Sequence, residues 1–142
     1  MEPKQCFLPK KGVLTNFLVN DYNDIQVDFD RYDRLSMLKD NNHRIKEHQK
    51  TAVKFHLSRK KCILADDMGL GKTSITLTAI NNLLFDSFEV HKVLVIAPLR
   101  VARDTWTTEI DKWDHLQNLI CSVAVGTEAE RKAALMRPAD IY

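Results

Sequence analysis

The sequence predicts an α/β layered fold with a mostly parallel sheet, and three observations support this prediction. Apolar runs typical of buried strands recur along the chain, at residues 62–66, 93–97 and 119–125. A segment with helical periodicity follows each run, at residues 72–85, 101–114 and 127–136. A turn with two glycines joins the first run to its helix. Strands that alternate with helices pack as a parallel sheet covered by helices.

The turn before residues 72–85 has the layout of a P-loop, because an apolar strand leads through glycines into Gly-Lys-Thr at a helix start. Backbone N–H groups at a helix N-terminus lack intrahelical partners and favour negative charge. Glycines allow these groups to approach a phosphate closely. Lys72 would place a positive charge on the β and γ phosphates, and the Thr73 hydroxyl would complete a Mg²⁺ shell.

The strict pattern is GxxxxGK[ST], and Asp66 stands where that pattern has its first glycine. An ordinary glycine turn with a surface lysine is the alternative, but it leaves the coincidence of strand, glycines, Lys-Thr and helix unexplained. We therefore predict a nucleotide site in which Lys72 and Thr73 are catalytic and Thr73 is the metal ligand. The predicted nucleotide-binding residues of the loop are Asp67, Met68, Gly69, Leu70, Gly71, Lys72, Thr73 and Ser74.

Length and composition allow one folded core, since the chain has 142 residues of which 44% are hydrophobic. A formal net charge of +2 is too small to imply a nucleic-acid partner. The charge is unevenly distributed, with acidic residues concentrated in 21–33 and basic residues in 44–61. Two solvated faces of opposite sign explain this pattern at least as well as a binding surface.

The three cysteines, Cys6, Cys62 and Cys121, are odd in number and widely scattered. This pattern indicates a reducing, cytosolic setting and argues against both a disulfide framework and a zinc site. No apolar run approaches the length needed to span a membrane, and the N-terminus lacks the apolar core of a signal peptide. We therefore expect a soluble intracellular chain without a membrane partner.

Residues 1–43 form an N-terminal extension of unknown role. Residues 13–19 fit either a strand or a short helix. Ile25, Val27 and Phe29 alternate with polar residues as in a half-buried strand. We expect a small β or mixed element here that covers an edge of the main sheet.

Two helices are predicted on either side of the first strand. The first spans residues 44–58, with capping side chains at residues 40–42. The second spans residues 72–85, and its expected solvent-facing residues are Thr76, Thr78 and Asn82. Its expected buried face consists of Ile75, Ala79, Ile80, Leu83 and Leu84.

The C-terminal third contains two further helices. Trp106, Ile110 and Trp113 repeat at helical spacing in 101–114, which favours core packing over a stacking platform for bases. Thr127-Glu128-Ala129-Glu130 is a capping box that starts the helix of 127–136. Residues 139–142 read as the entry to another strand.

Three segments, in this order, resemble motifs of Swi/Snf-type ATPases in helicase superfamily two. Residues 45–55 resemble the adenine-recognition segment, in which Gln49 stands where the family's glutamine reads the base. Residues 65–73 resemble the first helicase motif, where an aspartate commonly replaces the first glycine, as Asp66 does here. Residues 93–113 resemble the next motif, whose loop touches the nucleic-acid backbone. By position those contacts would come from Pro98, Leu99 and Arg100.

The resemblance covers roughly residues 44–142 and is nearest to phage and bacterial members. It implies that 44–142 is part of a RecA-like ATP-binding lobe of the P-loop NTPase fold, with ATP and Mg²⁺ as cofactors. It also implies double-stranded DNA and a second RecA-like lobe as partners in a full-length protein. The expected location is the cytoplasm of a bacterium or of a phage-infected host.

The family's Asp-Glu box, which holds Mg²⁺ and positions the attacking water, does not occur in the 142 residues, nor does the second lobe with its arginine finger. Phosphoryl transfer depends on metal, positioned water and added positive charge. We therefore expect a truncated lobe that binds Mg-ATP with little or no hydrolysis. A stand-alone nucleotide- or nucleic-acid-binding module is the main alternative. A small kinase is a third, disfavoured by Asp66 and by the lack of a visible second substrate site.

Overall fold

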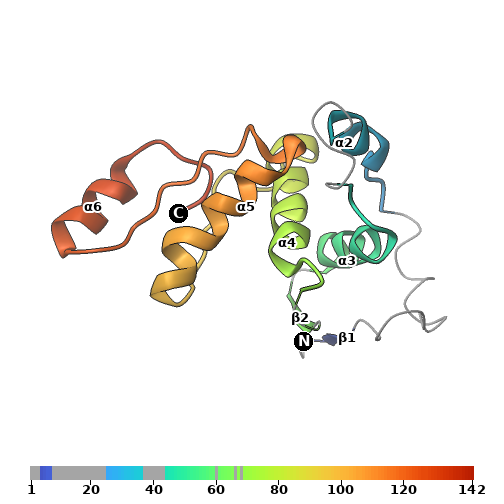
Figure 1. Ribbon diagram of the computed structural model, residues 1–142, viewed down its shortest axis with the longest axis horizontal. Helices are drawn as coiled ribbons and strands as arrows, with labels where there is room; N and C mark the ends of the chain where they lie inside the picture. The colour runs from blue at the N-terminus through green and yellow to red at the C-terminus, as the bar shows by residue number, and fades with distance from the viewer. Residues whose placement is uncertain (1–3, 8–24, 37–43, 60, 66, 68) are drawn as a thin grey trace. The chain divides into compact units, whose positions relative to one another are not determined.

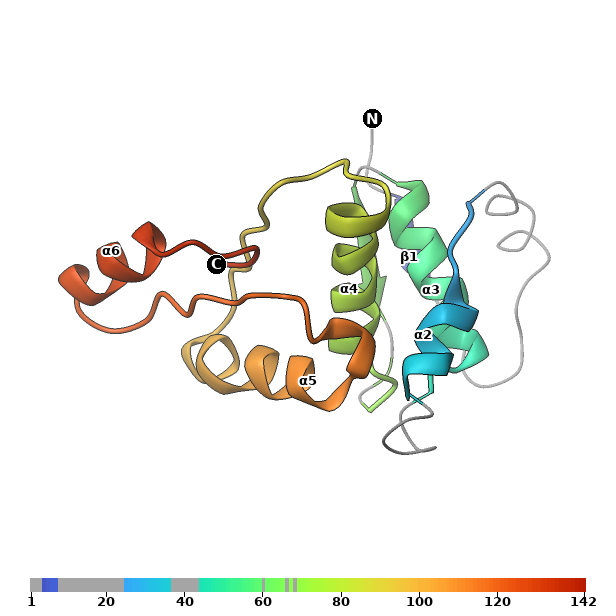
Figure 2. The same cartoon turned by 90° about the horizontal axis from the view of Figure 1, so that it is seen from above.

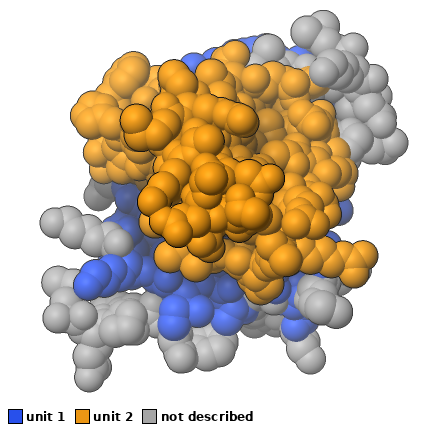
Figure 3. Space-filling model, turned by 90° about the vertical axis from the view of Figure 1, so that its left-hand side faces the viewer, with its two compact units in different colours: residues 1–79 blue, residues 80–142 orange. Residues whose placement is uncertain are grey.

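The computed structural model describes residues 4–7, 25–36, 44–59, 61–65, 67 and 69–142. The chain divides into two compact units, residues 1–79 and residues 80–142 (Figure 3). Within the described ranges, no helix is both long enough and apolar enough to cross a membrane. The predicted domains, 1–43 and 44–142, stay a prediction.

Unit 1 contains a parallel strand pair and most of the predicted P-loop helix. Its elements are β1 (Lys4–Phe7), α2 (Phe29–Ser36), α3 (Glu47–Ser58), β2 (Cys62–Ala65) and α4 (Lys72–Asn81), whose last two residues belong to unit 2 (Figures 1 and 2). β1 and β2 pair in parallel, with Lys4 opposite Cys62 and Phe7 opposite Ala65. The extension therefore contributes a β element beside β2, although not at the residues where the alternating pattern placed it.

The predicted strand at residues 25–29 is wrong, because α2 begins at Phe29. The Asp28 carboxylate accepts a hydrogen bond from the Arg31 N–H at 2.9 Å, which caps the first turn. Phe29 and Tyr32, one helical turn apart, are both buried. The capped first turn and the burial of two aromatic rings therefore favour a helix more strongly than the alternation of three apolar residues favours a strand.

Helix α3 starts later than predicted, at Glu47 instead of residue 44, and ends at Ser58 as expected. Its beginning is fixed by two side chains that accept backbone N–H groups. Gln49 Oε1 accepts from Lys46 at 2.9 Å, and Asp33 Oδ1 accepts from Ile45 at 3.3 Å. The predicted caps at 40–42 lie outside the described residues.

Helix α4 is buried more completely than an amphipathic helix would be. Four of the five residues expected on its buried face are buried, namely Ile75, Ala79, Ile80 and Leu84. The predicted exposure of Thr78 and Asn82 is wrong, since they are only 2% and 7% exposed. The Thr78 hydroxyl donates to the Ser74 carbonyl at 2.7 Å, so its polar group is satisfied inside the helix. The helix continues into the π-helical turn η1 (Asn82–Asp86).

The helices of unit 2 follow the predicted order. After η1, they are η2 (Val101–Thr105), α5 (Trp106–Lys112), the single turn η3 (Asp114–Leu116) and α6 (Glu128–Met136). Ile110 and Trp113 are buried, and Trp106 is half-buried. The Trp113 indole N–H donates to the Glu109 carboxylate at 2.9 Å. The core interpretation of this apolar repeat is confirmed for Ile110 and Trp113.

The three strand predictions in unit 2 are confirmed only as extended segments with parallel pairing. Ile141 forms parallel bridges with Val93 and with Cys121. The Val93 N–H donates to Asp140 O, and the Ser122 N–H donates to Ile141 O, both at 2.8 Å. Pairing is confined to residues 140–142, which lie between the other two segments, so neither 93–97 nor 119–125 forms a continuous strand. The described residues are mostly helical, and the broad layered sheet is not formed among them.

The predicted capping box of α6 is present. Thr127 Oγ1 accepts from the Glu130 N–H at 3.4 Å, and Glu130 Oε2 accepts from the Thr127 N–H at 2.7 Å. The hydrogen bond from the Thr127 backbone, followed by that from its hydroxyl, lowers the pKa of Glu130. The capping contribution is therefore present above the ordinary pKa of a glutamate and is lost as pH falls through the lowered value.

Replacement of Thr127 by alanine should destabilise unit 2, because one helix-start N–H loses its acceptor. The expected loss in the free energy of unfolding is about 1 kcal/mol in urea denaturation. Thr108→Ala, which alters an exposed threonine inside α5, is the matched control and should cost little. Equal stabilities for the two variants would contradict the capping role.

A neutral histidine–cysteine contact joins α3 to β2. His56 Nδ1 lies 3.5 Å from Cys62 Sγ, and His56 Nε2 is buried without a hydrogen-bond partner among the described residues. Burial lowers the pKa of His56 and raises the pKa of the Cys62 thiol. Both side chains are therefore uncharged at neutral pH.

Acid should weaken unit 1 through His56, because the folded state resists protonation below the ordinary histidine pKa of 6.5. The stabilising contribution is complete above pH 6.5 and is lost as pH falls through the lowered value. Denaturation midpoints measured from pH 7.5 to pH 5 should fall less steeply in His56→Phe than in the parent. His91→Gln, at an exposed histidine, should keep the parent profile, and a parent profile in His56→Phe would refute the assignment.

Candidate nucleotide site

The predicted phosphate loop is a tight turn between β2 and α4. Gly69 and Gly71 have φ angles of +83° and +82°. This left-handed region costs a residue with a Cβ roughly 1–2 kcal/mol, whereas glycine adopts it freely. The two glycines are therefore required by the path of the backbone. Asp66 and Met68 lie outside the described residues.

The loop leads directly into the first turn of α4. The Gly71 carbonyl accepts from the Ile75 N–H and from the Ser74 hydroxyl, both at 2.9 Å. The N–H groups of residues 72–74 precede this first intrahelical bond, so they are the donors that a helix start offers to an anion. Lys72 and Thr73 are half-buried in the same turn.

Gln49 is brought to the loop from α3, over a separation of 21 residues. Its Nε2 donates to the Leu70 carbonyl at 3.3 Å, while its Oε1 accepts from Lys46. His48 Nε2 lies 3.4 Å from the same Leu70 oxygen. The sequence alone did not indicate that His48 lies at the loop, apart from its position next to Gln49.

The space around the glycines fits a phosphate cradle that is closed on one side. A Cβ at Gly71 would collide with Gln49 Nε2 and would lie 2.9 Å from Ser74 Oγ. A Cβ at Gly69 would meet no atom of the described residues within 4 Å. The residues present suit an anionic phosphate group and a hard metal ion, because helix-start N–H groups, a lysine and a threonine hydroxyl occur together.

The remaining predicted residues are placed as follows. Asp67 is exposed, and Ser74 is buried with its hydroxyl bonded to the loop. In unit 2, Pro98, Leu99 and Arg100 are exposed at the start of the helical segment before η2. The Pro98 carbonyl accepts from the Ala102 N–H at 2.9 Å, which begins that helix. Nucleic-acid contact by these three residues stays a prediction.

Comparison with known families gives a match over most of the chain. A model of the family described as SNF2-related domain matches residues 48–141. The matched range begins at His48 and includes Gln49, the glycine loop and Arg100. The segment that contains α2 lies outside it.

Three of the relatives come from a phage, a mouse and a chicken. Protein p41 of Acyrthosiphon pisum secondary endosymbiont phage 1 is 41% identical over 88 residues, which are 62% of this chain and 19% of p41. The DNA excision repair protein ERCC-6-like of Mus musculus is 44% identical over 72 residues, 47% of this chain and 6% of that protein. The DNA repair and recombination protein RAD54-like of Gallus gallus is 34% identical over 103 residues, 62% of this chain and 14% of that protein. The chain thus spans less than a fifth of the length of each.

The two loop glycines offer a matched pair of substitutions. Gly69→Ala and Gly71→Ala should each cost about 1 kcal/mol of backbone strain in urea denaturation. Gly71→Ala should cost more, because its methyl group also displaces the Gln49 amide and crowds Ser74. Equal destabilisation by the two substitutions would show that Gln49 does not pack against Gly71.

Proposed function

The chain belongs to the SNF2-related domain family, and on that premise we propose that it is the ATP-binding part of a DNA-stimulated Swi/Snf-type ATPase. Membership of this family implies a RecA-like P-loop fold. The observation that carries the proposal is the hydrogen bond from Gln49 to the Leu70 carbonyl. It joins the residue in the base-reading position to the loop in the phosphate-binding position.

Each proposed role follows from the chemistry of a side chain. Lys72 holds the β and γ phosphates as a positive charge, and the Thr73 hydroxyl is a ligand for Mg²⁺. Bound Mg²⁺ neutralises charge on the phosphate oxygens. The backbone of Asp67 to Ser74 surrounds the phosphates, and Gln49 reads the adenine edge. No Asp-Glu pair occurs in the sequence, so we propose binding with little or no hydrolysis by this chain.

A nucleic-acid contact is proposed for Pro98, Leu99 and Arg100 in unit 2. All three side chains are exposed, and Leu99 is 60% exposed. An exposed arginine next to a helix start can contact a phosphate of the nucleic-acid backbone. Two of the relatives are named for DNA repair. We propose double-stranded DNA and a second RecA-like lobe as partners of the whole protein.

The test of ATP binding is calorimetric titration of the 142-residue chain with Mg-ATP and Mg-ADP. Lys72→Ala removes a charged hydrogen-bond donor from the phosphates and should weaken binding by roughly tenfold or more. Lys61→Ala, at an exposed lysine before β2, is the matched control and should bind as the parent does. Saturable binding that is equally strong in Lys72→Ala would refute the loop as the site. A folded parent that binds neither nucleotide would refute the proposed function.

A further inference from the structure

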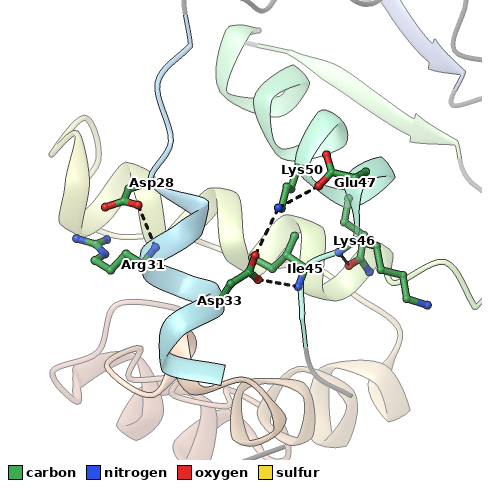
Figure 4. A network of polar contacts seen from close by, with 8 residues as sticks. Asp28, Arg31, Asp33, Ile45, Lys46, Glu47 and Lys50 are labelled. Carbon is green, nitrogen blue, oxygen red and sulfur yellow. Dashed lines mark hydrogen bonds and ion pairs between the residues drawn. The ribbon is translucent and has the colours of Figure 1, made fainter. Parts of the chain in front are cut away.

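One carboxylate joins α2, which lies outside the family match, to the start of α3 (Figure 4). Asp33 Oδ1 accepts from the Ile45 N–H at 3.3 Å, and Asp33 Oδ2 lies 3.4 Å from Lys50 Nζ. The Lys50 and Asp33 side chains are only 21% and 23% exposed. A single residue of α2 therefore contacts the chain just before α3, at Ile45, and the first turn of α3, at Lys50.

A packed aromatic cluster presents this carboxylate. Tyr32 is 1% exposed and Phe29 is 7% exposed, and their rings meet edge to face at 6.3 Å. Lys50 Nζ lies 5.8 Å from the centre of the Phe29 ring, a distance that allows a cation–π contact. Ile45, whose N–H bonds to Asp33, is also buried. The helix that carries Asp33 is thus anchored by buried side chains, and the Asp33 carboxylate is held in a defined position.

Lys50 remains charged in this setting. Burial alone would lower its pKa, but the hydrogen bond to Glu47 and the charge of Asp33 outweigh burial and raise the pKa of Lys50. The Lys50–Glu47 pair, at 3.1 Å, lies within α3, where the Glu47 side chain is 90% exposed. The Asp33 ion pair, together with the contact on the Phe29 ring, links Lys50 to α2.

Gln49 lies between the two points that Asp33 holds. Ile45 precedes it by four residues and lies before α3, and Lys50 follows it directly. Its amide bonds Lys46 on one side and Leu70 on the other. The Gln49–Leu70 distance of 3.3 Å is slightly beyond the usual range for an N–H···O bond. A small rotation of the first turn of α3 would therefore break the link to the loop.

We propose that Asp33 and Lys50 are positioning residues that set the amide of Gln49 for base recognition, so that α2 controls the nucleotide preference of the site. This inference rests on the proposed function, in which Gln49 reads the base. If the role of the ion pair is merely structural, its loss lowers stability and weakens the binding of all ligands alike. If the pair positions Gln49, its loss alters discrimination between bases and leaves the binding of the phosphates unchanged.

The experiment uses the 142-residue chain and measures dissociation constants for Mg-ATP, Mg-GTP and Mg-tripolyphosphate by calorimetry. Asp33→Ala should reduce the preference for ATP over GTP about fivefold, a size typical of coupling between neighbouring residues. Its affinity for tripolyphosphate should change by less than about twofold, since the loop glycines and Lys72 are intact. Asp30→Ala, at an exposed aspartate on α2, is the control and should keep the parent preference.

Asp33→Asn guards against loss of folding, because an asparagine can still accept from Ile45 while losing its charge on Lys50. It should reduce the preference for ATP less than Asp33→Ala does. In the Gln49→Ala background, Asp33→Ala should cause no further change in preference. Both Asp33 variants must melt cooperatively for their binding data to be compared. If Asp33→Ala does not melt cooperatively, the nucleotide preference of Asp33→Asn alone tests the positioning role.

Three outcomes overturn the inference, and they differ in what they say of the proposed function. If Gln49→Ala leaves the ATP preference unchanged, base reading by Gln49 fails and the positioning role fails with it. If Gln49→Ala reduces the preference but neither Asp33 variant does, only the positioning role fails. If the Asp33 variants weaken ATP, GTP and tripolyphosphate equally, the pair is structural.

Discussion

The side-chain amide of Gln49 accepts from the Lys46 N–H at its oxygen and donates to the Leu70 carbonyl from its nitrogen. Because an amide carries acceptor and donor on separate atoms, one side chain can hold a helix start and a loop at once. The residue is only 7% exposed, so loss of either partner would leave a buried polar atom unsatisfied, at about 1–3 kcal/mol. Gly71 is the other half of this constraint, since only a residue without a Cβ leaves room for the amide.

The position of Gln49 itself depends on a series of contacts within unit 1. Tyr32 anchors α2, and α2 presents Asp33 to the beginning of α3. The beginning of α3 in turn sets Gln49, and Gln49 holds the loop that opens α4. Each hydrogen bond contributes little alone, but bonds in a buried network reinforce one another. The family match begins at residue 48, whereas the network that supports the site begins earlier in the chain.

The sequence predicts those features that local chemistry decides. The loop follows from Gly69 and Gly71, and the start of α6 follows from Thr127 and Glu130, because each requires particular residue types at fixed spacing. The position of Gln49 beside the loop follows only from a family resemblance, since no local rule joins residues 21 positions apart. Helix α2 was missed because alternation at residues 25–29 imitates a strand. The Asp28 cap was the overlooked signal. Continuous strands at 93–97 and 119–125 were overpredicted, since apolar runs indicate burial but not how many backbone groups find partners.

The central claim is that the Gln49 amide holds the glycine loop between β2 and α4 in place. Amide hydrogen exchange at Ile75 in the nucleotide-free chain, with and without Gln49→Ala, tests it most directly. The Ile75 N–H donates to the Gly71 carbonyl at 2.9 Å, so its exchange reports local opening where the loop enters α4. Faster exchange of Ile75 in Gln49→Ala, with unchanged exchange in α6, is the predicted result. Equal protection of Ile75 in both proteins would contradict the claim, because the loop would then be held without the amide.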